Sequence, residues 1–293
     1  MGFEMTRPRV IWLSLGLKAT EIVVTWSLYG AWGIFLLAAA ALHAQQTPES
    51  LEKMARNPVG DAVKIPLEVD INFDAGPYGR TSNSLQFQPT IPFRMGEDWL
   101  LIARIIGTIE AYEPEVSQAN GGSTGIGDTV ATFFLTPAHT GTVVWGLGPS
   151  LLIPTATATT TGVGKWGLGP SLAFVVQTNW GSIVTAVHNV WSLPGRSQRA
   201  SVDQLQIETS LSYNLPHGWY LLTAPTLSAD WTQSSEERWL IPFGGGVGRT
   251  VEIAKNAVDW SIALYSNAIR PVGQASPKWQ MSLQCTLLHP RGR

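Results

Sequence analysis

Charged side chains recur at every second position in several segments of this 293-residue chain. In residues 63–73, for example, Lys64, Glu68 and Asp70 alternate with Val, Ile, Leu and Phe. Because successive side chains of a strand point to opposite faces, these charges would gather on one face. The same parity selects eight residues: Lys64, Glu68, Asp70, Arg94, Arg104, Glu110, Glu208 and Asp259. Such charges could neutralise one another in salt bridges, or could select solutes by charge.

Two of these residues suggest a particular solute. Arg94 and Arg104 flank the turn 95–98, and their guanidinium groups could attract an anion such as a carboxylate. The sequence leaves both interpretations of the charged face open, a neutralised network and a selective lining.

Other residues with chemical potential form no convincing site. Residues 162–167 match G-x-G-x-x-G, but a strand pattern follows them instead of the helix that dinucleotide binding requires. The glycine-rich run 244–248 indicates a bend or close packing of strands. His188 and Ser192 could serve a membrane lipase, yet no third group nearby would orient the histidine. The five histidines lack metal-ligand spacing, so we predict no catalytic, metal or cofactor-binding residues.

The elements that must position the charged face are long strands. Twelve segments of alternating apolar and polar residues lie between Asp61 and Pro290. They run about 10 to 16 residues, whereas a typical globular strand has roughly 5 or 6 and about 9 to 11 tilted residues cross a bilayer. Long connections such as 113–124 and 156–164 alternate with tight turns such as 95–98 and 178–181. This asymmetry predicts an all-β antiparallel transmembrane barrel of about twelve strands in the bacterial outer membrane. A soluble β-sandwich is the structural alternative.

Composition agrees with this class. Charged residues make up only 14% of the chain, against about 25% in an average soluble protein. The net charge of −2 suggests no nucleic-acid partner. The single cysteine, Cys285, excludes an intrachain disulfide, and its parity directs it toward lipid.

The first 44 residues have the character of an export signal. A basic start with Arg7, Arg9 and Lys18 precedes the apolar core 34–42, and Ala44 provides a small residue at a cleavage position. Residues 22–42 could instead span a bilayer as a retained anchor.

A short segment, 45–60, follows the signal and precedes the barrel domain 61–290. Pro48 in the first turn and the Asn57-Pro58 stop predict a short helix over 48–56. This helix could sit in the periplasm or plug the barrel mouth.

Aromatic residues and prolines mark the strand ends and irregularities. We expect a girdle of tryptophans at the membrane interfaces, where the indole ring is favoured, formed by Trp99, Trp145, Trp166, Trp219, Trp239, Trp260 and Trp279. Prolines inside strands remove ladder hydrogen bonds and predict bulges or breaks at Pro66, Pro89, Pro92, Pro149, Pro170, Pro225 and Pro242.

One heptapeptide occurs twice, as Trp145–Leu151 and Trp166–Leu172, both reading Trp-Gly-Leu-Gly-Pro-Ser-Leu. Together with several further blocks, this motif resembles a known family; the blocks are 57–61, 88–93, 133–137, 153–156, 164–171 and 189–192. The family comprises outer-membrane proteins named for the MetA pathway of phenol degradation, often labelled transporters or neuromedin U. The resemblance implies an outer-membrane barrel that takes up small compounds, with aromatic compounds as candidates. The chain departs from many barrels in ending on His289-Pro290-Arg291-Gly292-Arg293 instead of an aromatic residue.

We therefore predict a porin-like channel for passive or facilitated diffusion of small molecules. Its expected partners are outer-membrane lipid, a small solute and the barrel assembly machinery. The alternatives are a structural or adhesive barrel with a filled lumen, whose loops meet a partner, and a membrane lipase.

Overall fold

The computed structural model describes residues 48–115, 117–139, 141–194, 199–253, 256–272 and 276–290. All of them belong to one compact unit, Ala40–Arg293. The predicted export signal and the C-terminal tail 291–293 lie outside the described residues. No helix within the described ranges is long and apolar enough to cross a membrane.

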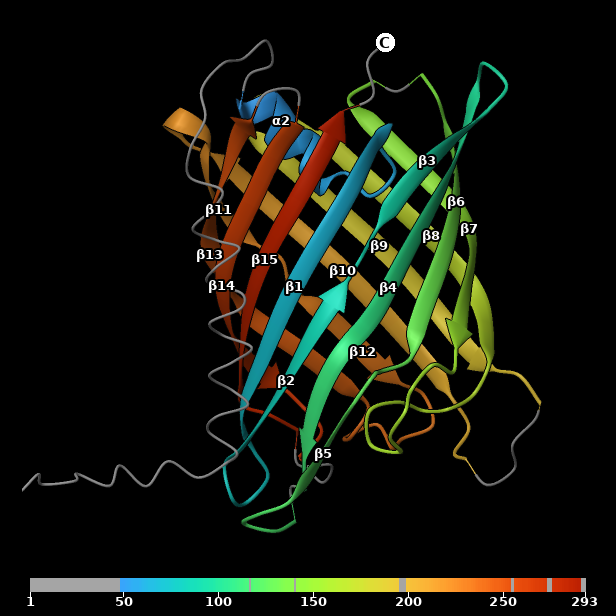
Figure 1. The fold of residues 1–293 in the computed structure, drawn as a ribbon, viewed down its shortest axis with the longest axis vertical. Coiled ribbons are helices and arrows are strands. Elements are labelled where there is room, and N and C mark those ends of the chain that lie inside the picture. The colour runs from blue at the N-terminus through green and yellow to red at the C-terminus, as the bar shows by residue number, and fades with distance from the viewer. Residues whose placement is uncertain are drawn as a thin grey trace, which may run out of the picture. The chain divides into compact units, whose positions relative to one another are not determined.

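The described residues form one helix, a short 3-10 turn and a single antiparallel sheet (Figure 1). The helix is α2 (Pro48–Arg56), and the 3-10 turn is η1 (Pro216–Gly218). The first strands are β1 (Ala62–Ala75), β2 (Arg80–Phe87), β3 (Thr90–Met95), β4 (Trp99–Pro114), β5 (Gly122–Gly125), β6 (Thr129–Pro137), β7 (Val143–Ile153) and β8 (Gly167–Gln177). The others are β9 (Gly181–Ser192), β10 (Asp203–Asn214), β11 (Trp219–Thr223), β12 (Thr226–Asp230), β13 (Trp239–Ile253), β14 (Asn256–Ile269) and β15 (Trp279–Pro290).

The sheet closes on itself as a barrel of twelve wall strands. Pairing runs from β1 in both directions and meets where β9 pairs with β10. Three wall strands are each interrupted once, as β2 and β3, β5 and β6, and β11 and β12, so the fifteen segments within the described ranges make twelve strands. The predicted strand number and fold class are confirmed.

Proline accounts for two of the three interruptions. Pro89 separates β2 from β3, and Pro225 separates β11 from β12, as the sequence predicts. At the first break the ladder is bridged by hydrogen bonds from Gln88 N to Pro66 O, at 2.9 Å, and from Ile105 N to Pro89 O, at 3.0 Å. At Pro242 the register with β14 shifts, which is the expected bulge. Pro66 lies opposite the first break, because the pairing of β1 lapses between Leu67–Phe87 and Lys64–Thr90. Pro92 stays inside β3 and pairs with Ile102, so the prediction of a break there is wrong.

The repeated heptapeptide forms a matched pair of ladder defects. Its two copies lie antiparallel on β7 and β8 with Pro149 directly opposite Pro170. On their outer sides, pairing with β6 lapses at Gly148-Pro149 and pairing with β9 lapses at Gly169-Pro170. A Cβ on Gly148 would stand 1.8 Å from the carbonyl oxygen of Phe133, so only glycine permits this approach. The repeat therefore tightens the wall on either side of the β7–β8 pair.

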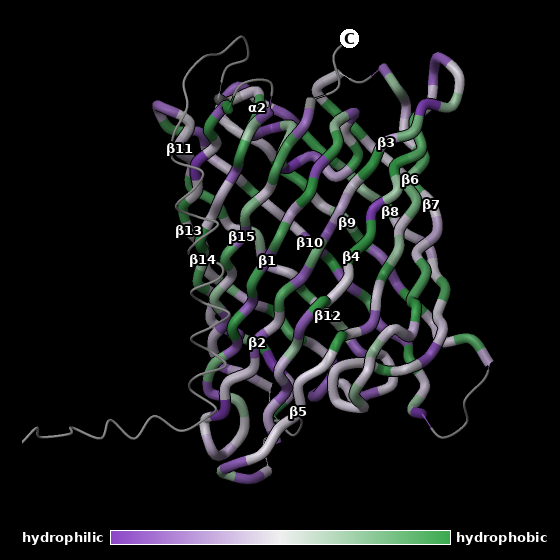
Figure 2. The backbone as a smooth tube through the Cα atoms, in the orientation of Figure 1, coloured by the Kyte–Doolittle hydropathy of each residue, from purple (hydrophilic) through white to green (hydrophobic). Residues whose placement is uncertain are grey.

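The two faces of the wall differ in chemistry. Hydrophobic and hydrophilic residues alternate along the strands (Figure 2). Large apolar side chains such as Leu147, Leu221 and Leu264 are half exposed on the outside, whereas Thr132, Ser150 and Thr250 are buried on the inside. An apolar exterior around a polar interior is the arrangement of outer-membrane β-barrels, and the chain is a barrel of that type. Cys285 shares the outer face with Leu67, its cross-strand neighbour.

Loop lengths distinguish the two ends of the barrel. At one end strands are joined by the short connections 96–98, 178–180 and 215–218. At the other end lie longer loops such as 115–121, 154–166 and 193–202. We call the first end periplasmic, because outer-membrane barrels have short periplasmic turns. Helix α2 lies at this end (Figure 1).

Candidate functional site

Helix α2 lies inside the periplasmic mouth of the barrel. It packs against β9, β13, β14 and β15, which are strands of two separate parts of the wall. Leu51 is 1% exposed and packs against Ala62, Ala257 and Leu288 on the inner face. Of the two positions that the sequence leaves open for this helix, the structure shows the plug.

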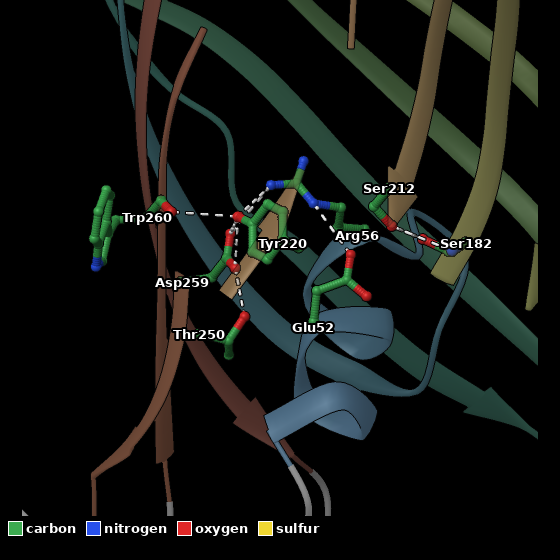
Figure 3. Close-up of polar contacts among 8 residues, drawn as sticks. All are labelled: Glu52, Arg56, Ser182, Ser212, Tyr220, Thr250, Asp259 and Trp260. Carbon is green, nitrogen blue, oxygen red and sulfur yellow. Dashed lines mark hydrogen bonds and ion pairs between the residues drawn. The ribbon is translucent and has the colours of Figure 1, made fainter. Parts of the chain in front are cut away.

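Arg56, in the last turn of α2, anchors the helix to the wall (Figure 3). Its guanidinium group donates a hydrogen bond to the hydroxyl of Tyr220, stands 4.6 Å from the centre of that ring and lies 3.6 Å from Asp259 Oδ2. The Tyr220 hydroxyl in turn donates to Asp259, at 2.9 and 3.0 Å to its two oxygens, and Thr250 donates to Asp259 Oδ1 at 2.7 Å. The Asp259 carboxylate is thus shared between three wall strands and the helix.

Glu52 stands one helical turn before Arg56, and the two side chains form an ion pair with 3.4 Å between Oε1 and Nε. Glu52 is almost fully buried. Burial raises the pKa of the Glu52 carboxyl above its ordinary value, and the nearby Arg56 charge only partly offsets that effect. The plug therefore carries a carboxyl group that is disfavoured in its charged form.

The chain after α2 closes the rest of the mouth with one apolar side chain. Val59 is 1% exposed, and its backbone N–H donates to Asn57 Oδ1 at 3.0 Å. Lys64 donates to the carbonyl oxygen of Asn57, which ties this segment to β1. Val59 packs on an apolar layer of the inner wall made of Leu100, Ile102, Phe134, Val144, Ala173, Val175, Val184 and Ala186. Gly146 leaves the space for Val59, because a Cβ there would stand 2.8 Å from Val59 Cγ1.

A polar layer follows the apolar one toward the outer end. On β4 Ile102 gives way to Arg104, on β6 Phe134 to Thr132, and on β9 Ala186 to His188, each two residues further along the same inward face. Arg104 and Glu208 meet in this layer with two hydrogen bonds of 2.9 and 2.6 Å.

The polar layer is one connected network. Arg104 also donates to Gln88 Oε1 at 3.3 Å, and Gln88 donates to Glu68 at 2.7 Å. Ser282 donates to Glu68 at 2.7 Å, which extends the network to β15. Asp70 accepts a hydrogen bond of 3.2 Å from Gln86.

Six of the eight predicted lumen residues therefore lie inside the barrel: Lys64, Glu68, Asp70, Arg104, Glu208 and Asp259. Arg94 lies at the periplasmic mouth, where its side chain is 58% exposed and pairs with Asp61 at 2.9 Å. The role of the predicted lumen residues in solute selection stays a prediction.

Glu110 is the residue whose position the alternation misplaces. Gln86 pairs with Thr108 and Leu85 with Glu110, so β4 has one extra residue, Ile109, at this point. A one-residue bulge reverses the side-chain parity beyond it. Glu110 consequently shares the outer face with Leu85, and the prediction that it lines the lumen is wrong.

The residues that hold the plug were missed by the strand pattern, chiefly Glu52, Arg56, Val59 and Tyr220. Glu52 and Arg56 stand four apart, the spacing of neighbours on one helix face, which was the available local signal. Their wall partners lie more than 150 residues away along the chain, and no local pattern indicates them.

The His188–Ser192 dyad that the lipase alternative would need does not form. His188 and Ser192 both lie on β9 and are four residues apart, which separates them by about 13 Å at the rise of a strand. Ser192 Oγ accepts a hydrogen bond from Val202 N at 3.0 Å, and His188 is buried in the lumen. In the described ranges no group of three or more His, Cys, Asp and Glu side chains could hold a metal ion.

The tryptophans lie near the ends of strands and several of them pair. At the periplasmic end, Trp99 meets Trp145 edge to face at 6.2 Å between ring centres, and Trp219 meets Trp260 at 5.4 Å. At the outer end Trp239 pairs with Trp231 at 5.8 Å. The girdle at the membrane interface stays a prediction, and these pairs have the positions that it requires.

No protein-family model matches the chain, and no curated protein matches its sequence. Solved structures do match. The COG4313 outer membrane channel from Pseudomonas putida F1 aligns with a TM-score of 0.56 at 16% identity, over 83% of this chain and 100% of that one. The toluene transporter TbuX of Ralstonia pickettii gives 0.40 at 11% identity, over 82% and 93%. The outer membrane phospholipase A of Escherichia coli gives 0.40 at 10% identity, over 84% and 100%. At these identities the first likeness shows a shared barrel fold, and the two lower scores carry no argument.

Proposed function

We propose that this protein is an outer-membrane channel for small molecules, and that the structure describes its closed state. The observation that carries this proposal is that the lumen is filled by a segment that is not part of the barrel wall. The periplasmic half of the lumen is filled by α2 and Val59, which belong to a segment outside the wall. Such a segment can leave the lumen without breaking a single ladder hydrogen bond of the barrel.

The proposed family is that of the MetA-pathway outer-membrane proteins, and the solute class is small organic compounds. The resemblance of the repeated heptapeptide and its neighbouring blocks supports this assignment. The barrel fold shared with the channel from Pseudomonas putida F1 is compatible with it. Uptake would be diffusive, since none of the lumen residues in the described ranges suggests an energy source.

Solute flux into liposomes that contain the refolded full-length protein tests the proposal. We expect slow flux of small aromatic compounds in the wild type and faster flux in Arg56→Gln, because this change removes the charge that binds α2 to Asp259 and Tyr220. Arg249→Gln is the matched control, since Arg249 lies at the same end but stacks on Trp219 and donates to the carbonyl oxygen of His217. Absence of flux in both the wild type and Arg56→Gln, with the barrel folded, would overturn the channel.

That outcome would favour the second candidate, a structural or adhesive barrel. The specific observation in its favour is the Arg104–Glu208 pair, which spans the lumen on the outer side of the plug. If the lumen stays closed in every variant, the function must reside in the long outer loops.

A further inference from the structure

Arg104 already binds a carboxylate in the geometry expected for a carboxylate ligand. Its two terminal nitrogens, Nη1 and Nη2, face the two oxygens of Glu208 at 2.9 and 2.6 Å. A planar guanidinium that holds both oxygens is the arrangement by which arginine selects carboxylates. The Arg104 side chain is 13% exposed, and the carboxylate comes from a distant strand of the wall and not from a neighbour of β4.

An apolar compartment adjoins this pair. Ile102 precedes Arg104 on the inward face of β4, about 7 Å away at the rise of a strand. Ile102 and Phe134 belong to the apolar layer, and the side chain that fills it is Val59 of the plug. A carboxylate-binding fork and an apolar compartment therefore lie next to each other on the inward face of the wall, and each is occupied by a side chain of the protein itself.

We propose that the boundary between the two layers is a binding site for small carboxylates with a compact apolar body, such as a single ring. The carboxylate of the ligand replaces that of Glu208 on Arg104, and the apolar body replaces Val59 against Ile102 and Phe134. This inference rests on the proposed function, because the ligand reaches the site only when the plug moves. It narrows the solute from small organic compounds to apolar monocarboxylates.

The charges around Arg104 allow the exchange. Lys64 lies within electrostatic reach of Arg104, Glu68 within reach of both Arg104 and Glu208, and Asp70 within reach of Glu68, so Glu208 is one of three carboxyl groups that share this region with two basic side chains. When a ligand displaces Glu208 from Arg104, the Glu208 carboxylate still faces His188. This histidine lies on the neighbouring strand β9 and interacts with Glu208 electrostatically. Glu208 is also 25% exposed, so the displaced group is not left without any solvent.

Calorimetric titration of the full-length protein folded in detergent tests the site without requiring transport. The probes are benzoate, benzyl alcohol, which keeps the ring but lacks the charge, and acetate, which keeps the charge but lacks the ring. We expect benzoate to bind and the other two probes to bind at least about tenfold more weakly, a difference of about 1.4 kcal/mol.

Three variants separate the parts of the site. Arg104→Gln should abolish benzoate binding, whereas Glu208→Gln should strengthen it about tenfold, because the competing charge is gone. Arg94→Gln is the matched control: it removes an arginine that pairs with Asp61 at the mouth, and benzoate binding should not change. Misfolding could explain a loss of benzoate binding, but it cannot explain the stronger binding that we expect in Glu208→Gln.

The outcomes distinguish this site from the proposed function. Absence of benzoate binding in both the wild type and Glu208→Gln, or equal binding in Arg104→Gln, overturns the site. If neutral aromatic solutes still cross liposomes in that case, the channel stands and only the carboxylate site fails. If benzoate binds as expected but no solute crosses, the site stands and transport fails.

Discussion

Arg104 on β4 and Glu208 on β10 form a two-bonded ion pair across the lumen of the barrel. Four wall strands separate β4 from β10 in one direction around the barrel, and six separate them in the other. The pair therefore links nearly opposite sides of the wall, in the layer next to the apolar compartment that Val59 fills.

Arg104→Gln and Glu208→Gln should each lower the free energy of unfolding by about 2 kcal/mol, since removal of one partner leaves the other without its counter-charge. We expect less than the full effect for a buried pair because Glu208 is 25% exposed. The double variant should lose less than the sum of the two single losses. Urea unfolding of the protein folded in lipid vesicles measures all three. Additive losses would show that the two side chains do not depend on each other.

The strand pattern predicted the wall well because alternation is a local property. Lys64, Glu68 and Asp70 face inward as their parity requires, since β1 pairs without a shift along this stretch. Glu110 shows the limit: a single bulged residue, Ile109, reverses the parity, and nothing in its neighbours signals the bulge. The pairing of Arg104 with Glu208 depends on how many strands close the ring, which is a global property. The position of the plug is harder still to predict from the sequence, because Arg56 is held by Tyr220 and Asp259, which lie far from it along the chain.

Gly146→Ala should expel the plug and leave the wall intact. The new Cβ would stand 2.8 Å from Val59 Cγ1, and Val59 can respond by leaving the lumen with the segment that carries it. Trypsin should then cleave the freed segment after Lys53, inside α2, and after Arg56, at its end, several times faster than in the wild type. Mass analysis of the fragments identifies these sites.

Two further variants control this prediction. Gly141→Ala adds the same methyl group where no atom lies within 4 Å, and it should leave cleavage unchanged. Adding Val59→Ala to Gly146→Ala should restore protection, since the smaller side chain fits beside the new methyl group. Protection that stays at the wild-type level in Gly146→Ala would show that Val59 is not held in this position.

The docking of α2 should weaken as the pH rises. Because the pKa of Glu52 in the docked helix is raised above the ordinary value of 4.5, docking favours the protonated carboxyl. The stability that this proton provides is present below the ordinary pKa and is lost as the pH rises through the raised value of the docked state. Arg56 and Asp259 lie beside Glu52, and Arg56 keeps its charge throughout.

A fluorophore on Lys53→Cys, in a Cys285→Ser background, would report this docking through its exposure to a soluble quencher. Quenching should increase in the protein with Glu52 as the pH rises above the ordinary glutamate pKa of 4.5. In Glu52→Gln it should remain low and flat, because the amide does not ionise. A pH-dependent signal of equal size in both proteins would assign the change to another group.

Gly148→Ala should prevent the wall itself from forming, in contrast to the neighbouring Gly146→Ala. A Cβ at Gly148 would stand 1.8 Å from the carbonyl oxygen of Phe133, which is backbone of β6 and cannot rotate away as a side chain can. We expect a loss of at least about 3 kcal/mol, the upper range for overpacking. The folded and unfolded forms of a stable barrel migrate differently in unheated gel electrophoresis, and the folded band should be lost or strongly reduced.

Gly169→Ala provides an independent copy of the same experiment. Gly169 holds the equivalent position in the second heptapeptide, and its Cβ would stand 1.6 Å from the carbonyl oxygen of Asn189 on β9. If the repeat exists to tighten the wall on both sides of the β7–β8 pair, the two variants should fail to fold to a similar degree. Gly141→Ala should fold as the wild type does, because its methyl group meets no atom within 4 Å. A normal folded band for Gly148→Ala would mean that β6 and β7 can separate at this point, and the close approach would then not be required for the barrel.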